Sequence, residues 1–339
     1  MFKWRELFSA PPSVLTVVGM AKNAGKTVAM NYIQAMLRAD GHTIGLTSVG
    51  RDGEQFDALT LLAKPAVGVE PGTLVATAEA TVVARECWDC LERIPIRTPL
   101  GAVGILRARD KTQVVLAGPS KNSEVQAVVK KLAGHGADCV IIDGAFDRQS
   151  SADPTVSEQV VLATGATLSR NMAELIDFTR TRIEQLALPP AGEHLAAAAG
   201  AEARIVALAA GERREIPAPT TLLGEEDWRR IIGAGADTLM LRGAVGDGLA
   251  AALLREPAPP AIIVVDGSKI FIRPELWRRL MAKNVRIFAA RPINLLGVTV
   301  NPSFPGGEGL DPDELLAAMG RTLYPVPVID IVREKRYRP

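Results

Sequence analysis

The feature that most constrains the fold is a glycine-containing segment between an apolar run and a helical pattern. Residues 14–18 (VLTVV) are short, apolar and rich in β-branched side chains, as expected of a buried strand. The segment GMAKNAGKT, residues 19–27, follows, and the apolar spacing of residues 27–41 predicts a helix that ends near Gly41. A strand, a tight loop and a helix in this order are typical of a parallel α/β sheet.

The same alternation continues along the first half of the chain. A helix is predicted over residues 124–132, and strands are predicted over residues 42–49, 113–117 and 137–142. Continuous apolar strands that alternate with helices indicate a parallel sheet covered on both faces. The first domain is therefore predicted to be α/β.

A change in composition at residues 186–203 (LALPPAGEHLAAAAGAEA) suggests a domain boundary, because adjacent prolines interrupt a helix. We predict a nucleotide-binding domain over residues 1–188 and a second α/β domain, for coupling or partner binding, over 189–339. The second domain is expected to contain a helix at 274–282 and strands at 204–208, 238–241, 261–265, 285–289 and 296–300.

The loop ends in Gly25-Lys26-Thr27, which is the ending of a Walker A motif, in the required setting between a strand and a helix. Backbone N–H groups and the positive end of the helix can hold phosphate oxygens, Lys26 can reach the β- and γ-phosphates, and Thr27 can bind Mg²⁺. The predicted nucleotide-binding residues of this loop are Gly19, Lys22, Asn23, Ala24, Gly25, Lys26, Thr27 and Val28.

The loop also departs from the standard motif. Five residues separate Gly19 from Gly25 instead of four, so Met20 occupies the usual position of the first glycine. Lys22 invites comparison with the NifH/MinD-like ATPases, whose extra loop lysine reaches the nucleotide of a neighbouring subunit, but here it is one residue closer to Lys26. The role of Lys22 across a subunit interface, and with it a homodimer, is therefore left open. Two alternatives to triphosphate binding also stay open: the loop could bind another phosphate-bearing ligand, or it could be a strand-to-helix junction that binds no nucleotide.

Polar residues that could complete such a site follow three other predicted strands. Asp143 ends the apolar run from Cys139, as in a Walker B segment, and Asp52 lies in TSVGRDGEQFD after the second strand. Ligands bind at the carboxyl ends of parallel strands. We predict Lys26, Asp52 and Asp143 as catalytic residues and Thr27, Asp52 and Asp143 as metal ligands, although strand-end acids also serve as turn residues. Asn301, in VTVNP, is a further candidate for contact with the base or substrate.

Composition disfavours several classes of function. Lysine and arginine (39) almost balance aspartate and glutamate (38), so no global field favours nucleic acid. The start lacks a secretory signal pattern, and no apolar stretch reaches the roughly 20 residues needed to span a bilayer. A cytoplasmic protein without nucleic-acid or membrane partners is expected. A helix is predicted over residues 78–86 (AEATVVARE). Cys87 and Cys90 follow it as a single C-x-x-C pair, which favours reduced structural thiols over zinc.

Several stretches together resemble a family of P-loop proteins encoded beside lysine 5,6-aminomutase: GMAKNAGKT, TSVGRDGE, KPAVGVEPGTLVATAEA, IIDGAFDR and TVNPSFPGG. The resemblance spans most of the chain. It implies an ATP-binding, ATP-hydrolysing reactivase component that exchanges damaged for intact cofactor in the adenosylcobalamin-dependent aminomutase, working with a second subunit similar to the MutS mismatch-repair ATPases. ATP and Mg²⁺ would be its cofactors, with Asp52 and Asp143 organising the metal and the attacking water.

Two other classes of function use the same phosphate chemistry. One is a biosynthetic ligase or kinase that spends ATP on a small metabolite, as dethiobiotin and cobyrinate amide synthetases do. The other is a nucleotide-controlled binding module with negligible hydrolysis. No NKxD-like guanine signature stands out in the sequence, which favours ATP and leaves GTP open.

Overall fold

A computed structural model describes residue 6 and residues 10–50, 67–145, 154–192, 203–210 and 212–338. The chain forms two compact units, Met1–Ile176 with Leu295–Pro339 and Asp177–Asn294. The predicted linear division into 1–188 and 189–339 differs from this arrangement, because the chain returns to the first unit after residue 294. Within the described ranges, no helix combines the length and apolarity needed to cross a membrane.

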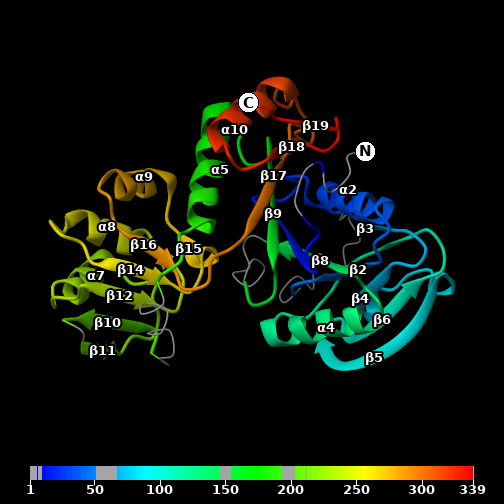
Figure 1. The fold of residues 1–339 in the computed structure, drawn as a ribbon, viewed down its shortest axis with the longest axis horizontal. Helices are drawn as coiled ribbons and strands as arrows, with labels where there is room; N and C mark the ends of the chain where they lie inside the picture. Colours follow the sequence, from blue (N-terminus) through cyan, green and yellow to red (C-terminus); the bar gives the residue numbers. More distant parts are fainter. Residues whose placement is uncertain are drawn as a thin grey trace. The chain divides into compact units, whose positions relative to one another are not determined.

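The first unit contains a ten-stranded sheet, which confirms the predicted α/β class (Figure 1). The strand order is β19-β18-β17-β9-β1-β8-β2-β4-β6-β5, and the seven neighbouring strands from β18 to β4 are parallel. The outer strands β19, β6 and β5 are antiparallel to their neighbours. The strands are β1 Val14–Gly19, β2 Ile44–Ser48, β4 Leu74–Ala78, β5 Trp88–Thr98, β6 Gly101–Ala108, β8 Cys139–Ala145, β9 Gln159–Gly165, β17 Leu295–Asn301, β18 Val328–Asp330 and β19 Lys335–Arg336.

Helices cover both faces of this sheet around β1 and β8. Helix α2 (Lys26–Ala39) packs on one face, where its apolar side chains join Leu15 and Ile141 in one core. Helix α4 (Asn122–Gly134) packs on the other face against Val140 and its neighbours (Figure 1). Successive residues of a strand point to opposite faces. Burial on both faces therefore explains why β1 and β8 are apolar over most of their length.

Two local expectations in the first unit were wrong. Residues 78–86 were predicted as helix, but they form two 3₁₀ turns, Glu79–Thr81 and Arg85–Cys87, that lead into β5. The Thr81 hydroxyl donates to the Ala78 carbonyl at 2.8 Å, which closes a turn instead of an α-helix. The predicted strand 113–117 is only β7, Thr112–Val114, which pairs with β3 (Val67–Val69) in a separate two-stranded sheet.

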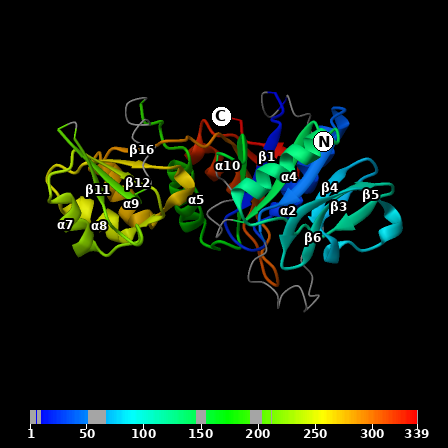
Figure 2. The same ribbon diagram turned by 90° about the horizontal axis from the view of Figure 1, so that it is seen from below.

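The second unit has a five-stranded sheet in the order β11-β10-β12-β14-β16, in which β12, β14 and β16 are parallel. Its core contains the fully buried Trp228 and Trp277, contributed by two of the three helices on one side of the sheet (Figure 2). Its elements are helices α7 Glu225–Ile232, α8 Asp247–Arg255 and α9 Pro274–Ala282, sheet strands β10 Ile205–Ala209, β11 Glu212–Ile216, β12 Thr238–Leu241, β14 Ala261–Val264 and β16 Ile287–Ala289, and a parallel pair β13 Val245–Gly246 and β15 Ile270–Phe271. The boundary between the units lies within helix α5, Met172–Leu186.

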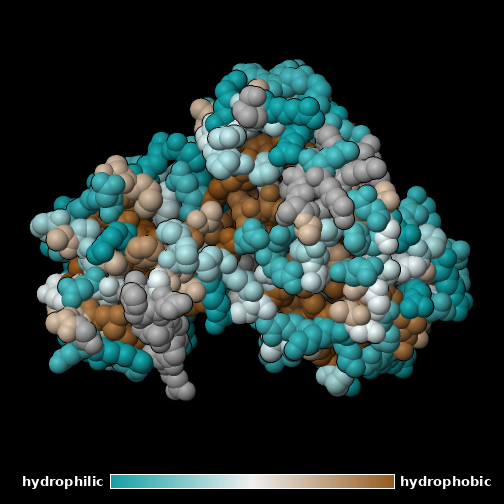
Figure 3. All heavy atoms as spheres, in the orientation of Figure 1, coloured by the Kyte–Doolittle hydropathy of each residue, from teal (hydrophilic) through white to brown (hydrophobic). Residues whose placement is uncertain are grey.

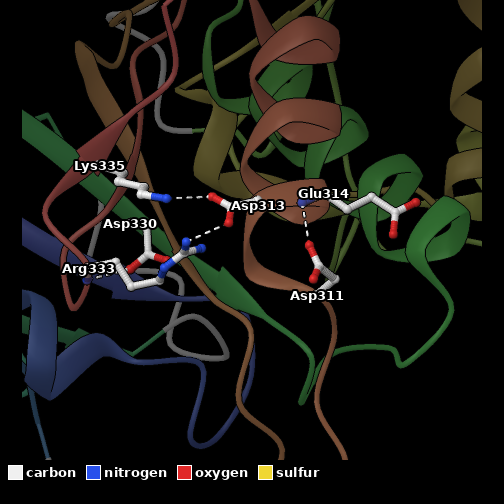
Figure 4. Close-up of polar contacts among 6 residues, drawn as sticks. All are labelled: Asp311, Asp313, Glu314, Asp330, Arg333 and Lys335. Carbon is white, nitrogen blue, oxygen red and sulfur yellow. Dashed lines mark hydrogen bonds and ion pairs between the residues drawn. The ribbon is translucent and has the colours of Figure 1, made fainter.

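Helix α10 (Pro312–Leu323) connects β17 to β18, and ion pairs hold its first turn. Asp311 caps the helix by accepting the Glu314 N–H at 2.7 Å, and Asp313 pairs with Arg333 at 2.6 Å and Lys335 at 2.7 Å (Figure 4). Hydrogen bonds from these two cations lower the pKa of Asp313 to about 2. The surface over α10 is largely hydrophilic (Figure 3), whereas its inner side buries leucine and methionine side chains.

Candidate active site

The candidate site is built where parallel strands end at one edge of the ten-stranded sheet. In the register, Gly19 at the end of β1 lies beside Ala145 of β8 and Ala163 of β9. On the next strand, Asn301 at the end of β17 lies beside Gly165. The segments that leave these strands therefore start close together, as expected for a ligand-binding edge of an α/β sheet.

The segment between β1 and α2 is held in a loop by backbone contacts. The Met20 N–H donates to the Ala163 carbonyl at 2.9 Å, and the Ala24 N–H donates to the Ala21 carbonyl at 3.3 Å. Asn23 and Gly25 both have positive φ angles, 63° and 94°. The left-handed conformation at residue 25 favours glycine, because a side chain there would be strained.

Helix α2 begins at Lys26, and neither a capping side chain nor an acidic residue of its first turn offsets the partial positive charge of this end. Gly25 is the N-cap residue, no side chain caps the helix, and no acidic residue lies in its first turn. The first N–H groups of a helix lack partners within the helix and carry partial positive charge. The end of α2 is therefore suited to an anion.

Lys26 and Asp143 meet beside this loop. The Lys26 ammonium lies 2.7 Å from Asp143 Oδ1 and donates to the Gly144 carbonyl at 2.9 Å. The two side chains are 26% and 24% exposed, so solvent reaches the pair. Asp143 lies between β1 and β2 in the sheet, opposite Val17 and Ser48. The predicted lysine of the loop and the predicted strand-end carboxylate are thus brought together.

The other predicted loop residues differ in exposure. Lys22 and Asn23 are exposed, Ala24 is buried, Thr27 is half-buried in the first turn of α2, and Val28 is 48% exposed. Asp52, predicted as a catalytic residue and metal ligand, lies outside the residues that the structure describes.

Asn301 joins the site from β17. Its Nδ2 donates to the Asn23 carbonyl at 3.2 Å, and its Oδ1 accepts the Ser303 N–H at 3.1 Å. Asn301 was selected from its position after a predicted strand, but the sequence did not indicate that its side chain contacts the loop. Sequence reasoning also missed the Gly144 carbonyl and the close packing of Gly165, for which the glycines near the ends of the apolar runs in β8 and β9 are the available signals.

Asp266, which follows strand β14, has a structural role. Asp266 is buried and caps a 3₁₀ turn by accepting the Ser268 N–H at 2.8 Å. Cys87 is half-buried, Cys90 is exposed and Cys139 is buried, and all three are free thiols. Burial raises the pKa of the Cys139 thiol to about 12. Across the described ranges, no three His, Cys, Asp or Glu side chains form a group that could hold a metal ion.

Comparison of the chain with protein-family models and with curated proteins found no match.

Proposed function

We propose that the chain binds a nucleoside triphosphate, ATP in the first instance, with Mg²⁺ at the 19–27 loop and hydrolyses it. The observation that carries this proposal is the contact of 2.7 Å between Lys26 Nζ and Asp143 Oδ1 beside a helix that begins without a cap. A lysine, a strand-end carboxylate and free helix N–H groups are the protein groups that phosphoryl transfer requires.

The chemistry of the donors fits the proposed ligand. Backbone N–H groups and the Lys26 ammonium suit phosphate oxygens, and the positive φ of Gly25 lets the loop turn directly into the helix. The Thr27 hydroxyl and the Asp143 carboxylate are oxygen ligands of the kind that Mg²⁺ prefers. In this proposal Gly19, Lys22, Asn23, Ala24, Gly25, Lys26, Thr27 and Val28 form the phosphate site.

Lys26 and Asp143 each have a role both in the nucleotide-free site and in the nucleotide-bound site. Without nucleotide, each side chain neutralises the other. When phosphate oxygens accept hydrogen bonds from the Lys26 ammonium, the Asp143 carboxylate would be free to hold Mg²⁺ or a water bound to it. Bound Mg²⁺ would supply neutralisation of phosphate charge. Asp52 is proposed, from its sequence position, to help orient the attacking water.

The proposal is tested by Asp143→Asn, with Asp138→Asn as the matched control. Asp138 precedes the same strand at its other end, where it accepts the Thr43 N–H at 2.7 Å. We expect Asp143→Asn to reduce Mg²⁺-dependent phosphate release at least tenfold while ATP affinity changes less, because the metal-binding charge is lost. Asp138→Asn should retain both. Equal hydrolysis by Asp143→Asn and the wild type would contradict the role of Asp143, and a wild type that binds no ATP would refute the proposal.

We further propose that this ATPase serves as a reactivase component for an adenosylcobalamin-dependent lysine aminomutase, together with a MutS-like subunit. The support is the sequence resemblance described above. Phosphate release should rise when aminomutase inactivated by turnover is added, and it should not rise with intact enzyme. Stimulation by a small metabolite without any protein partner would instead favour a biosynthetic ligase or kinase. Retention of ATP without phosphate release under any condition would favour a nucleotide-controlled binding module.

A further inference from the structure

Asn301 contacts the phosphate loop through a side-chain amide whose orientation is determined by its two partners. The Ser303 N–H can only donate, and it reaches Oδ1 at 3.1 Å. The Asn23 carbonyl can only accept, and it lies 3.2 Å from Nδ2. Because an amide has one accepting and one donating end, these partners together place the donor toward the loop.

The accepting carbonyl belongs to the peptide between Asn23 and Ala24. The N–H of this same peptide donates to the Ala21 carbonyl at 3.3 Å. A trans peptide is planar, and its C=O and N–H point in opposite directions. The bond from Asn301 on one side and the bond to Ala21 on the other therefore determine how this peptide is rotated. Asn23, with φ 63°, is in a conformation that is uncommon for residues other than glycine.

Asn301 is itself closely packed between two glycines, with Gly165 against its backbone and Gly25 against its side chain. Its carbonyl accepts the Ala166 N–H at 2.9 Å. A Cβ atom added to Gly165 would lie 2.2 Å from that carbonyl oxygen, and one added to Gly25 would lie 3.1 Å from the Asn301 Cβ. Such short distances leave little room for displacement. The position of Asn301 is thus well defined, and its side chain can hold the loop peptide in one orientation.

We propose that Asn301 is a positioning residue for the phosphate loop, which holds the Asn23–Ala24 peptide in the conformation that receives phosphate oxygens. This inference rests on the proposed function of the loop. In this role the Asn301 amide acts through the loop backbone, so its loss affects every ligand that carries the phosphate chain, with or without a nucleoside.

The test uses the full chain with Asn301→Leu, a neutral substitution of similar size that removes the donor. Affinities for Mg·ATP and for Mg·tripolyphosphate, which lacks base and ribose, are measured by calorimetry. Both should weaken by about tenfold, the effect expected from loss of one hydrogen bond that orders the site. Asn31→Leu is the control, because the Asn31 side chain also makes one hydrogen bond, to the Gly68 N–H at 3.2 Å, on helix α2. It should leave both affinities within about twofold.

Amide hydrogen exchange of residues 19–27 in the ligand-free protein supplies a readout that needs no nucleotide. Exchange should become faster in Asn301→Leu and remain unchanged in Asn31→Leu. Asn301→Asp, which retains an acceptor for Ser303 but loses the donor, should also exchange faster, and it replaces Asn301→Leu if that variant does not fold.

Each contrary outcome has a separate meaning. If ATP affinity falls while tripolyphosphate affinity is retained, Asn301 contacts the nucleoside, and the positioning role is overturned. Unchanged affinities or unchanged exchange in the Asn301 variants also overturn it. If the wild type binds neither ligand, the proposed function fails, and the exchange measurement still decides whether Asn301 orders the loop.

Discussion

Replacement of Lys26 by methionine separates the structural and the ligand-binding contributions of the Lys26–Asp143 pair. Methionine retains most of the apolar stem and removes the ammonium that lies 2.7 Å from Asp143 Oδ1 and 2.9 Å from the Gly144 carbonyl. The change therefore removes one ion pair and one hydrogen bond, with little change in side-chain packing.

The expected loss of folding stability is small. Both partners of the ion pair are about a quarter exposed. Solvent screens such pairs, so a value near that of surface salt bridges, about 0.2–1 kcal/mol, is appropriate. The hydrogen bond to Gly144, which is partly exposed to solvent, contributes about 1 kcal/mol. The free energy of unfolding should fall by about 1–2 kcal/mol, which leaves a folded protein.

The expected loss of nucleotide affinity is larger. A charge-assisted hydrogen bond to phosphate contributes about 1.5–3 kcal/mol, and the lysine can bond to more than one phosphate oxygen. In the wild type the Lys26–Asp143 pair must break before Lys26 binds phosphate, and this cost offsets about 1 kcal/mol of the binding free energy. A net loss of about 2–3 kcal/mol corresponds to roughly 30- to 150-fold weaker binding of Mg·ATP.

Calorimetric titration with Mg·ATP and urea unfolding of the same samples measure the two quantities. Lys111→Met is the matched control, because Lys111 is 79% exposed and pairs only with Glu70 on the surface among the contacts described. It should change neither quantity appreciably. Unchanged ATP affinity in a folded Lys26→Met protein would refute the assignment of the phosphate loop.

Three further predictions concern the fold around the candidate site. Gly165→Ala should lower the free energy of unfolding by about 1–3 kcal/mol in urea titrations, because its Cβ would overlap a backbone oxygen of the neighbouring strand. Gly134→Ala is the control: a Cβ there meets nothing within 4 Å, so this change should not be destabilising. Asp313 has a lowered pKa of about 2, so its ion pairs should stabilise the wild type above about pH 4 and lose this effect as the pH falls toward 2. Thermal unfolding of Asp313→Asn should show less of this pH dependence, and an identical profile would contradict the prediction. At pH 8 a maleimide should label Cys90 in the native protein and Cys139 only after unfolding, since burial raises the pKa of the Cys139 thiol to about 12; mass spectrometry of labelled peptides would reveal the opposite order.

Local patterns in the sequence were sufficient to predict the main parts of the candidate site. The apolar run before Gly19 and the amphipathic spacing after Lys26 define a strand and a helix without reference to the rest of the chain. Asp143 was predicted to lie near the loop because a parallel sheet gathers the carboxyl ends of its strands, and the contact with Lys26 agrees with that reasoning.

The remaining features depend on contacts between distant residues. Nothing in the periodicity of residues 295–301 indicates that this strand pairs with β9 instead of joining the sheet of the second unit. Similarly, the alanine and glutamate of residues 78–86 favour a helix, but the following residues bury Trp88, Ile94 and Ile96 along the edge strand β5. Tertiary packing overrides local propensity in this segment.

The first unit is formed by two stretches of the chain that are separated by the whole second unit, and this has a consequence for synthesis of the protein. Strand β9 leaves the ribosome long before β17, because residues 166–294 are translated between them. Until β17 arrives, one side of β9 is an unpaired edge, which is a template for aggregation and a target for chaperones. The phosphate loop is likewise made early, but the Asn301 contact forms only when translation has nearly reached the last helix. Nascent chains arrested before residue 295 should therefore carry the whole loop sequence without a completed binding site.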